Sequence, residues 1–269
     1  MSTPHEPELP AEPATDPTAS DPNFMLSLAR GLAVLQAFSD QRRSLTIAQI
    51  SHRTAIPRAS VRRCLHTLIA LGYASADGNQ FSLKPKVLSL GYSYLSSTPL
   101  TVSAHPYLNQ VSRSLNESCS LGVLQDDEVL YVGRSAASRI MSVSLTTGSR
   151  LPAYCTALGR MLLAHLPAPE LDDYLARVPL KAMTACTVVN PERLRAILAE
   201  VRNAGYVLVE EELEVGLRSI AVPVRGASGN VLAALNIGAH AARVSRRKME
   251  EAFLPVLRAS AQELSILLP

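Results

Sequence analysis

The sequence lacks the features that would place a chain in a membrane or outside the cell. No apolar run reaches the roughly 18–20 residues that a membrane-spanning helix needs. The N-terminus has no basic region followed by an apolar segment, which is the pattern of a secretory signal peptide. We therefore expect a cytoplasmic protein that makes no contact with a membrane.

Cysteine and histidine are few and scattered. The 4 cysteines (Cys64, Cys119, Cys155 and Cys186) include no CxxC pair, and the 6 histidines show no zinc-ligand spacing. We therefore expect reduced thiols, no metal and no cofactor. Glycine-rich phosphate loops and the GxSxG motif are also absent. An enzyme would have to assemble a Cys–His pair from distant segments.

Residues 1–23 contain no lysine or arginine, but they carry five acidic residues and six prolines. With almost no large apolar side chains, this segment cannot offset its ordering entropy by burial. We expect a disordered, solvated leader. An alternative role for its charge is weak competition with DNA for a basic surface.

The next segment has the pattern of a helix-turn-helix. Thr46-Ile47-Ala48-Gln49 has the form of a capping box, in which the Thr hydroxyl and the Gln side chain satisfy backbone N–H groups. A turn over 53–56 follows, and Pro57 suits the first turn of the next helix. An earlier helix over 27–38 offers Leu28, Leu32, Leu35 and Phe38 as an inward face. Three short helices with one shared core are typical of this motif.

The helix from Pro57 to Leu68 is the predicted DNA-reading element. Its apolar residues gather on one side, while Arg62, Arg63 and His66 lie opposite. Exposed arginines are suited to guanine edges and phosphates in a major groove. Residues 24–85 carry eight lysines or arginines against two aspartates, an excess that favours a polyanion as partner.

A two-stranded wing is expected after this helix. Gly72 suits a left-handed helix end, and Asp77-Gly78-Asn79 separates two short strand-like runs, 73–75 and 80–83. Asp-Gly between such runs predicts a type I′ hairpin turn with positive φ at both central residues. The segment is therefore predicted to be a winged helix-turn-helix.

A second domain follows a short linker. Residues 86–97 form a broad apolar stripe that either packs on its own domain or pairs with a second copy, and we predict dimerisation through it. From residue 99 on, hairpins mixed with helices favour an antiparallel sheet covered by helices. The expected helices are 101–115, 156–165, 169–177, 191–204 and 245–268, and the expected strands are 118–124, 129–132, 140–145, 219–224 and 231–238.

The stretch Gly148 to Gly159 is the predicted ligand site, because a strand end here opens a helix whose first N–H groups suit an anion. Arg134 and Arg139 would add bidentate recognition of a carboxylate. The alternative is that Thr156 only caps the helix and that the arginines are solvated. We expect the acidic run Glu210-Glu211-Glu212, with Glu214, to lie on a solvated loop rather than to bind a metal.

Several segments together resemble the IclR family of bacterial transcriptional regulators over about residues 24–268. They are LARGLAVL (28–35), IPRASVRRCL (56–65), LGY (71–73), the stretch 148–159, GY (205–206) and EELEVGLRSIAVPV (211–224). Each segment is weak alone, whereas their order and spacing are specific. Segments 133–136, 139–143 and 150–156 look most like regulators of protocatechuate, 4-hydroxybenzoate and β-ketoadipate catabolism.

The resemblance implies an α+β chain with an acidic tail (1–23), a winged helix-turn-helix (24–85), a linker helix (86–98) and a GAF-like effector domain (99–269), assembled as dimers or dimers of dimers. The family's DNA contacts fall on Arg30, Thr46, Arg58, Ser60, Arg62 and Arg63. Its effector contacts fall on Ala157, Leu158, Leu217 and Ser219. The three segments that look like regulators of aromatic-acid catabolism add Arg134, Met141, Tyr154 and Thr156 as candidate effector contacts. Val209 stands where some members place an acidic pocket residue, so Arg134 is the first candidate to anchor a polar group.

These patterns predict a transcriptional regulator, not an enzyme, that binds double-stranded operator DNA and responds to a small aromatic or dicarboxylic acid. Binding of the acid would favour one arrangement of the linker helices and so change the spacing of the reading helices. One alternative is an enzyme acting on a small carboxylic acid with an attached DNA-binding module. Another is a constitutive architectural DNA binder, which leaves the second domain unexplained.

Overall fold

The computed structural model describes residues 21–39, 42–137 and 145–268, and the expectation for the acidic leader falls almost entirely outside them. The chain divides into two compact units, Met1–Tyr92 and Ser93–Pro269. The dividing point falls inside the linker helix, so the finer domain boundaries at 85/86 and 98/99 stay predictions.

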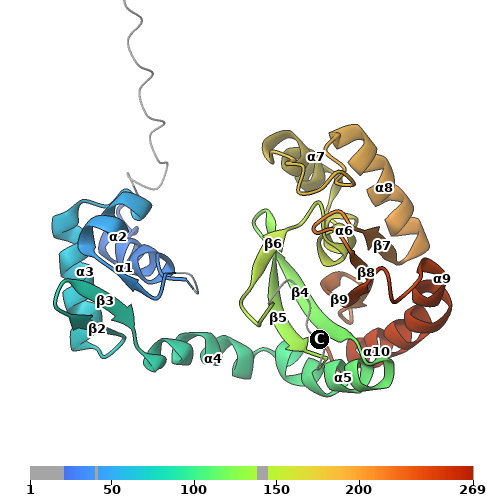
Figure 1. The fold of residues 1–269 in the computed structure, drawn as a ribbon, viewed down its shortest axis with the longest axis horizontal. Helices are drawn as coiled ribbons and strands as arrows, with labels where there is room; N and C mark the ends of the chain where they lie inside the picture. Colours follow the sequence, from blue (N-terminus) through green and yellow to red (C-terminus); the bar gives the residue numbers. More distant parts are fainter. Residues whose placement is uncertain (1–20, 40–41, 138–144, 269) are drawn as a thin grey trace, which may run out of the picture. The chain divides into compact units, whose positions relative to one another are not determined.

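The first unit contains three helices and a three-stranded antiparallel sheet of order β1-β3-β2 (Figure 1). Its elements are α1 (Leu26–Gln36), β1 (Ser44–Leu45), α2 (Ile47–Thr54), α3 (Arg58–Ala70), β2 (Ala74–Asp77) and β3 (Gln80–Leu83). Val34, Ile50, Val61 and Leu65 form its core. The predicted inward face of α1 is wrong in part, because Leu28 and Leu32 are 57% and 48% exposed. Strand β1 was not predicted.

The ends of α2 and α3 follow from local chemistry. The capping box is confirmed: Gln49 N donates to Thr46 Oγ1 at 3.3 Å, and Thr46 N donates to Gln49 Oε1 at 2.8 Å. Gly72 has a φ of +79°, and the next N–H, that of Tyr73, donates to the carbonyl of Leu68 at 2.8 Å. This left-handed closure ends α3 and turns the chain into the wing.

The wing turn differs from the expected type I′ turn. Asp77 pairs with Gln80, so the central residues are Gly78 and Asn79, and of these only Gly78 has a positive φ (+54°). A short 3-10 helix (Pro85–Val87) then leads to α4 (Leu88–Ser97), in which no residue is buried. Leu88 and Tyr92 of α4 are 75% and 68% exposed, so the described residues leave much of its apolar stripe uncovered.

The second unit is a six-stranded antiparallel sheet, order β6-β5-β4-β9-β8-β7, between two layers of helices (Figure 1). Helices α5 and α10 cover one face of the sheet, and α6 with α8 covers the other. The elements are α5 (Pro99–Leu115), β4 (Ser118–Gln125), β5 (Glu128–Ser135), β6 (Arg150–Pro152), α6 (Ala157–Leu163), α7 (Ala168–Arg177), α8 (Pro191–Ala204), β7 (Val207–Glu210), β8 (Leu217–Arg225), β9 (Val231–His240), α9 (Arg246–Lys248) and α10 (Leu254–Ile266).

This architecture confirms the expected α+β class. Strands β6 and β7 were not predicted, and the strand expected over 140–145 lies almost wholly outside the described residues. The helix expected over 245–268 is confirmed as a continuous helical run over 246–266, in which an unpredicted π turn at Met249–Phe253 joins α9 to α10. Within the described residues, no helix combines the length and the apolar character needed to cross a membrane.

Candidate nucleic-acid interface and candidate ligand pocket

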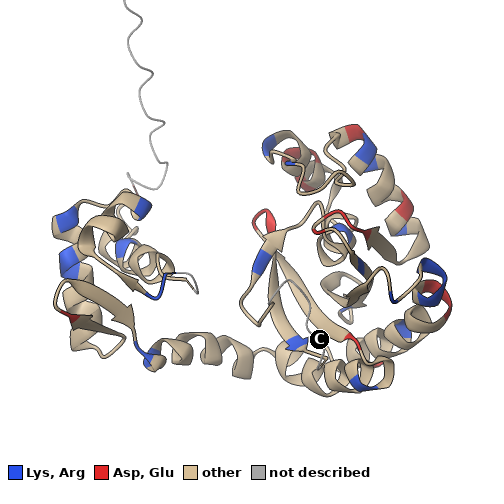
Figure 2. Ribbon diagram, viewed as in Figure 1, with Lys and Arg blue, Asp and Glu red and all other residues tan. Residues whose placement is uncertain are grey.

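The outward face of α3 carries three exposed arginines, Arg58, Arg62 and Arg63. They line one surface hollow together with the start of α2, including Thr46, and with Asn79 of the wing. In the described part of the first unit, Figure 2 shows mostly basic positions and few acidic ones. Four of the six predicted DNA contacts therefore lie on one electropositive surface, whose guanidinium groups suit phosphates and guanine edges.

The other two predicted DNA contacts, Arg30 and Ser60, line a second surface hollow, which Arg63 also borders. Ser60 is only 8% exposed, on the inward side of α3. Arg30 Nη1 donates to Ser60 Oγ at 3.4 Å, which links α1 to α3. In this geometry the Ser60 hydroxyl accepts a hydrogen bond from within the first unit, and its contact with DNA stays a prediction.

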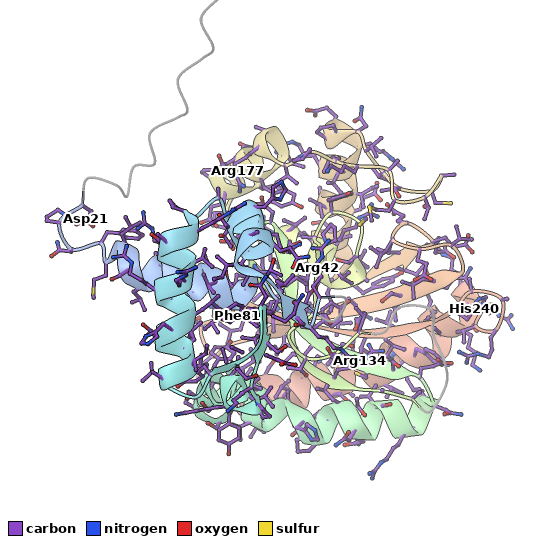
Figure 3. All side chains as sticks on the ribbon, turned by 60° about the vertical axis from the view of Figure 1, so that its left-hand side comes forward. Asp21, Arg42, Phe81, Arg134, Arg177 and His240 are labelled. Carbon is purple, nitrogen blue, oxygen red and sulfur yellow. The ribbon has the colours of Figure 1, made fainter. Side chains whose placement is uncertain are left out.

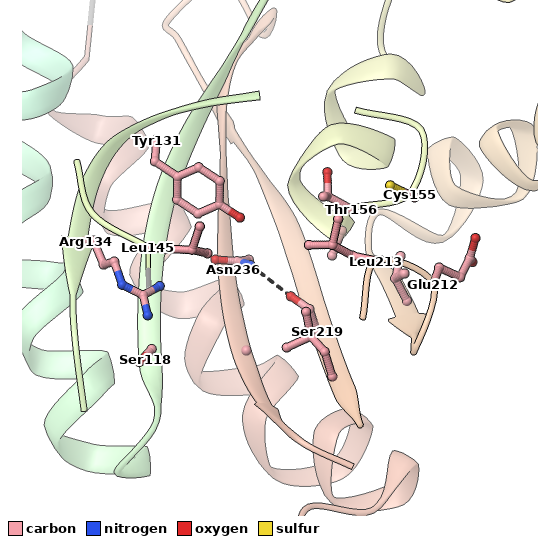
Figure 4. Close-up of a pocket in the computed structure, with 14 residues that line it drawn as sticks. Ser118, Tyr131, Arg134, Leu145, Cys155, Thr156, Glu212, Leu213, Ser219 and Asn236 are labelled. Atoms are coloured by element: carbon pink, nitrogen blue, oxygen red, sulfur yellow. Dashed lines mark hydrogen bonds between the residues drawn. The ribbon is translucent and has the colours of Figure 1, made fainter. Parts of the chain in front are cut away.

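A pocket opens in the second unit between the sheet and the start of α6 (Figure 4). Its cavity volume is about 40 Å³, below the range of about 300–1,000 Å³ that small-molecule sites usually occupy, so binding of an acid here would require the lining side chains to move. The lining residues are Ser118, Tyr131, Arg134, Leu145, Cys155, Thr156, Ala157, Val209, Glu212, Leu213, Leu217, Ser219, Asn236 and Gly238.

Arg134, near the end of β5 (Figure 3), supplies a positive charge to this pocket. Its Nη1 donates to Ser120 Oγ at 3.0 Å, whereas its buried Nε has no hydrogen-bond partner among the described residues. Burial lowers the pKa of Arg134, but a guanidinium stays charged in proteins because its ordinary pKa exceeds 12. The side chain therefore offers a buried, charged donor without an acceptor.

Asn236, on β9, supplies an amide to the same pocket and is only 7% exposed. Its Nδ2 donates to Ser219 Oγ at 2.8 Å, and Ser219 Oγ donates to the carbonyl of Ile237 at 3.0 Å. The Asn236 Oδ1 atom is buried and has no partner within the described parts of the chain. Burial also raises the pKa of Tyr131 to about 12, so the neighbouring phenol keeps its proton.

Glu212 corrects the expectation that the acidic run is solvated. It is 7% exposed, its Oε1 lies 2.6 Å from Arg160 Nη1, and its Oε2 accepts from Val188 N at 2.9 Å. Glu210 lies on β7 and pairs with Arg218 at 2.6 Å. The described residues hold no group of acidic, histidine or cysteine side chains placed to bind a metal. Arg160 was not recognised in the sequence.

The predicted effector contacts divide into three groups. Arg134, Thr156, Ala157, Leu217 and Ser219 line the pocket, and so does Val209. Tyr154 and Leu158 are buried in the adjacent core, where the Tyr154 hydroxyl donates to the carbonyl of Lys181 at 2.8 Å. Met141 and Arg139 fall outside the described residues.

Thr156 acts as a helix cap, the alternative that the sequence left open. Its hydroxyl accepts a hydrogen bond from Gly159 N at 3.1 Å and donates one to the carbonyl of Pro152 at 3.1 Å. The hydroxyl proton is therefore already used in a hydrogen bond within the chain. Cys155 beside it is a buried thiol whose pKa is raised to about 11, first by burial and then by Glu212. A protonated thiol is a poor nucleophile, and the described lining contains no histidine to activate it.

Sequence patterns assigned no role to Tyr131 or Asn236. A signal for Asn236 was available: it is the one amide in the apolar strand VLAALNIGAH (231–240). A polar side chain buried in such a strand needs a hydrogen-bond partner, and a partner missing from the chain itself suggests a ligand.

Two family models match the chain. The model described as bacterial transcriptional regulator IclR C-terminal matches residues 92–266, and the IclR helix-turn-helix domain matches residues 27–78. The Pca regulon regulatory protein of Pseudomonas putida is 57% identical over 245 residues, which cover 91% of this chain and 84% of that protein. The p-hydroxybenzoate hydroxylase transcriptional activator of Acinetobacter baylyi is 36% identical, covering 94% of this chain and 96% of its own length.

A solved structure agrees with these matches. The crystal structure of an IclR homolog complexed with 4-hydroxybenzoate, from Microbacterium hydrocarbonoxydans, superposes with a TM-score of 0.78 at 28% identity and covers 90% of this chain and 98% of that chain. The matching models and relatives are transcriptional regulators rather than enzymes. The chain belongs to the IclR family of bacterial transcriptional regulators.

Proposed function

We propose that this regulator binds operator DNA through the exposed arginines of α3, and that a small aromatic or dicarboxylic acid in the pocket of the second unit controls that binding. The observation that carries the ligand class is the buried Arg134 Nε, a charged donor without a partner among the described residues. Carboxylates form short charge-assisted hydrogen bonds with guanidinium groups. An acid bound here would complete the hydrogen bonding of Arg134.

The charge of the pocket supports an anionic ligand. Arg160 and Glu212 neutralise each other across 2.6 Å, so Glu212 does not oppose an acid as a free carboxylate would. Arg134 is then the uncompensated charge among the described lining residues. In a site largely shielded from water, a single unpaired cation attracts an anion more strongly than it would at the surface.

The named relatives support control of aromatic-acid catabolism. Two are described as a regulator of the Pca regulon and as an activator of p-hydroxybenzoate hydroxylase, and the solved homolog is a complex with 4-hydroxybenzoate. Segments 133–136, 139–143 and 150–156 of the sequence look like the same kind of regulator. Together with these names, they favour genes of aromatic-acid catabolism as the targets of this regulator.

We also propose that the active form is a homodimer or a dimer of dimers. The uncovered apolar side chains of α4, among them Leu88 and Leu90 at 75% and 49% exposure, support pairing through that helix. Two reading helices one DNA turn apart, about 34 Å, fit an operator with two half-sites. Light scattering of the full chain measures this, and a monomer at micromolar concentration would contradict it.

The first experiment is a thermal-shift screen of the full chain against protocatechuate, 4-hydroxybenzoate, β-ketoadipate and muconate. One acid should raise the unfolding temperature, since a ligand at 100 times its Kd stabilises the folded state by about 2.7 kcal/mol. Arg134→Met should abolish that shift while leaving DNA binding intact. No shift with any acid would reject the proposed ligand class.

DNA binding is tested separately, with an operator selected from a random DNA pool. Arg62→Ala and Arg63→Ala should each weaken operator binding by roughly 1–3 kcal/mol if the arginine reads a base. Arg247→Ala is the matched control, because it removes the same charge from an exposed site in the second unit. Unchanged affinity in both α3 variants would reject α3 as the reading helix.

A further inference from the structure

The C-terminal end of the reading helix α3 is bound by a lysine from the linker. Leu71 is the C-cap residue of α3, and its carbonyl accepts a hydrogen bond from Lys86 Nζ at 2.8 Å. The last carbonyl groups of a helix have no partner within the helix and carry its partial negative charge. A lysine here therefore supplies both the missing donor and a favourable positive charge.

Lys86 makes further contacts with the residues that follow Leu71. It belongs to the short 3-10 helix (Pro85–Val87) that leads into α4. Its Nζ lies 5.0 Å from the centroid of the Tyr73 ring, which is within cation–π distance. Its Cδ atom would lie 3.7 Å from a Cβ atom built on Gly72, so the stem of the lysine passes over that glycine. The start of the linker is thus fastened to the end of α3.

A backbone hydrogen bond joins the same two segments. Lys84 N donates to the carbonyl of Tyr73 at 2.8 Å, at the point where the wing ends and the linker begins. With this attachment alone, the direction of the linker could change at the few residues that follow, because a hinge needs only a few element-terminal residues. The contacts of Lys86 add a second attachment, so they also set the direction in which the linker leaves α3.

The start of α4 (88–92), which belongs to the first unit, carries the apolar surface of the proposed pairing. Leu88 and Leu90 are exposed there, and Ser89 Oγ donates to the carbonyl of Lys86 at 2.8 Å, which joins the first turn of α4 to the fastened residue. In a pair formed through α4, the contacts of Lys86 in each copy therefore affect how far apart the two α3 helices lie. That separation must match the half-sites of the operator.

We infer that Lys86 is a positioning residue that fixes the direction of α4 relative to α3 and so sets the half-site separation that the regulator accepts. The inference rests on the proposed pairing through α4. An exposed lysine beside a reading helix has one competing role, a phosphate contact, which strengthens binding to all DNA sequences alike. A positioning residue instead changes the choice between separations, so an experiment can distinguish the two roles.

The test measures the affinity of the full chain for a series of DNA duplexes by fluorescence anisotropy. Each duplex carries two copies of the selected half-site, at separations that differ by one base pair, and one further duplex carries a single half-site. One base pair moves a half-site by about 3.4 Å and turns it by about a tenth of a helical turn. The unmodified chain should prefer one separation by about tenfold or more, since a reading helix that misses its half-site loses base contacts.

Three variants assign this preference to the Lys86 ammonium. Lys86→Met keeps an apolar stem but removes the donor, so neighbouring separations should bind nearly equally. Lys84→Met is the matched control, because it removes the same charge from a nearby exposed side chain, and it should retain the preference. The two methionine variants should bind the single half-site with the same affinity. Lys86→Arg still offers donors to the Leu71 carbonyl and should retain most of the preference.

The outcomes separate the inference from the proposed function. An unchanged preference in Lys86→Met overturns the inference and leaves the proposed pairing intact. Weaker binding of Lys86→Met than of Lys84→Met to every duplex alike, the single half-site included, also overturns it, because a phosphate contact behaves in this way. If the unmodified chain prefers no separation, the proposed pairing through α4 is rejected and the inference with it.

Discussion

Arg160 and Glu212 form a buried ion pair at the edge of the pocket. Arg160 also donates through Nε to the carbonyl of Tyr154 at 2.8 Å, and Glu212 also accepts from Val188 N. The pair therefore joins α6 to the segments before and after it. Buried pairs cost desolvation energy when they form, and they are most costly when one partner alone is removed.

Arg160→Met should destabilise the protein by about 3–5 kcal/mol, because Glu212 would stay buried without its counter-charge. The free energy of unfolding in urea measures the effect. Arg247→Met is the control: its pair with Glu251 spans 3.5 Å with side chains 83% and 67% exposed, so its loss should cost no more than about 1 kcal/mol. Similar losses in the two variants would contradict the structural role given to Arg160.

Sequence patterns predicted some site residues and missed others for a physical reason. The exposed arginines of α3 were predictable because a helical period places them on one face. Glu212 was misjudged because its burial depends on Arg160, which lies 52 residues earlier in the chain. A local sequence pattern cannot reveal a partner that is so far away in the chain.

Elements with their own start and stop signals were predicted best. The expected helix 191–204 has the same bounds as α8, since Asn190 caps its start and Gly205, with a φ of +68°, ends it. Strands β6 and β7 were missed because they are only 3 and 4 residues long and are defined by pairing with β5 and β8. Short strands depend on their neighbours more than on intrinsic preference.

Helix α6 depends on a glycine for close packing. A Cβ atom added to Gly159 would overlap the backbone of Ala153, which no side-chain movement relieves. Gly159→Ala should therefore destabilise the protein by about 1–3 kcal/mol, the usual cost of overpacking. Chemical unfolding followed by circular dichroism measures it.

Gly31→Ala in α1 is the matched control for this prediction. Among the described residues, leaving out the backbone of α1 itself, nothing lies within 4 Å of a Cβ atom at Gly31, and alanine favours the helix by up to about 1 kcal/mol over glycine. The control should thus be neutral or stabilising. Tolerance of alanine at both positions would show that α6 moves away from Ala153 at little cost.

At the scale of the whole chain, DNA reading and ligand sensing belong to separate units, and composition already indicated this division. A net charge of +3 conceals an acidic leader and a strongly basic reading unit. The acid can control DNA binding only if it has different affinities for two arrangements of the protein. Sequence patterns do not specify those arrangements, because they depend on packing between surfaces far apart in the chain.

The second unit buries several weak acids in their neutral forms. Burial raises the pKa of Tyr131 from 10.0 to about 12 and that of Cys155 from 9.0 to about 11. It raises the pKa values of Cys119 and Tyr174 as well. In the unfolded chain these groups lose their protons at lower pH than in the folded protein.

The stability of the protein should therefore fall above pH 9. Below the unfolded pKa values both states are neutral at these groups, so their contribution is fully present. As the pH rises from about 9 to about 12, the unfolded state loses protons first and becomes relatively more stable. A shift of two pKa units corresponds to roughly 2–3 kcal/mol. Ionisation of Cys155 alone should therefore lower the free energy of unfolding measurably.

Urea unfolding at pH 7.5, 9 and 10 measures this loss. Cys155→Ala removes one of the titrating groups and should make the decline between pH 9 and pH 10 shallower, whatever its effect on stability at pH 7.5. Cys186→Ala is the control, because it removes an exposed thiol in place of a buried one. If Cys155→Ala and the unmodified chain lost stability equally between pH 9 and pH 10, ionisation of Cys155 would not contribute to alkaline unfolding. The loss of stability would then be due to Cys119 and the buried tyrosines, whose raised pKa values also lower stability as the pH rises.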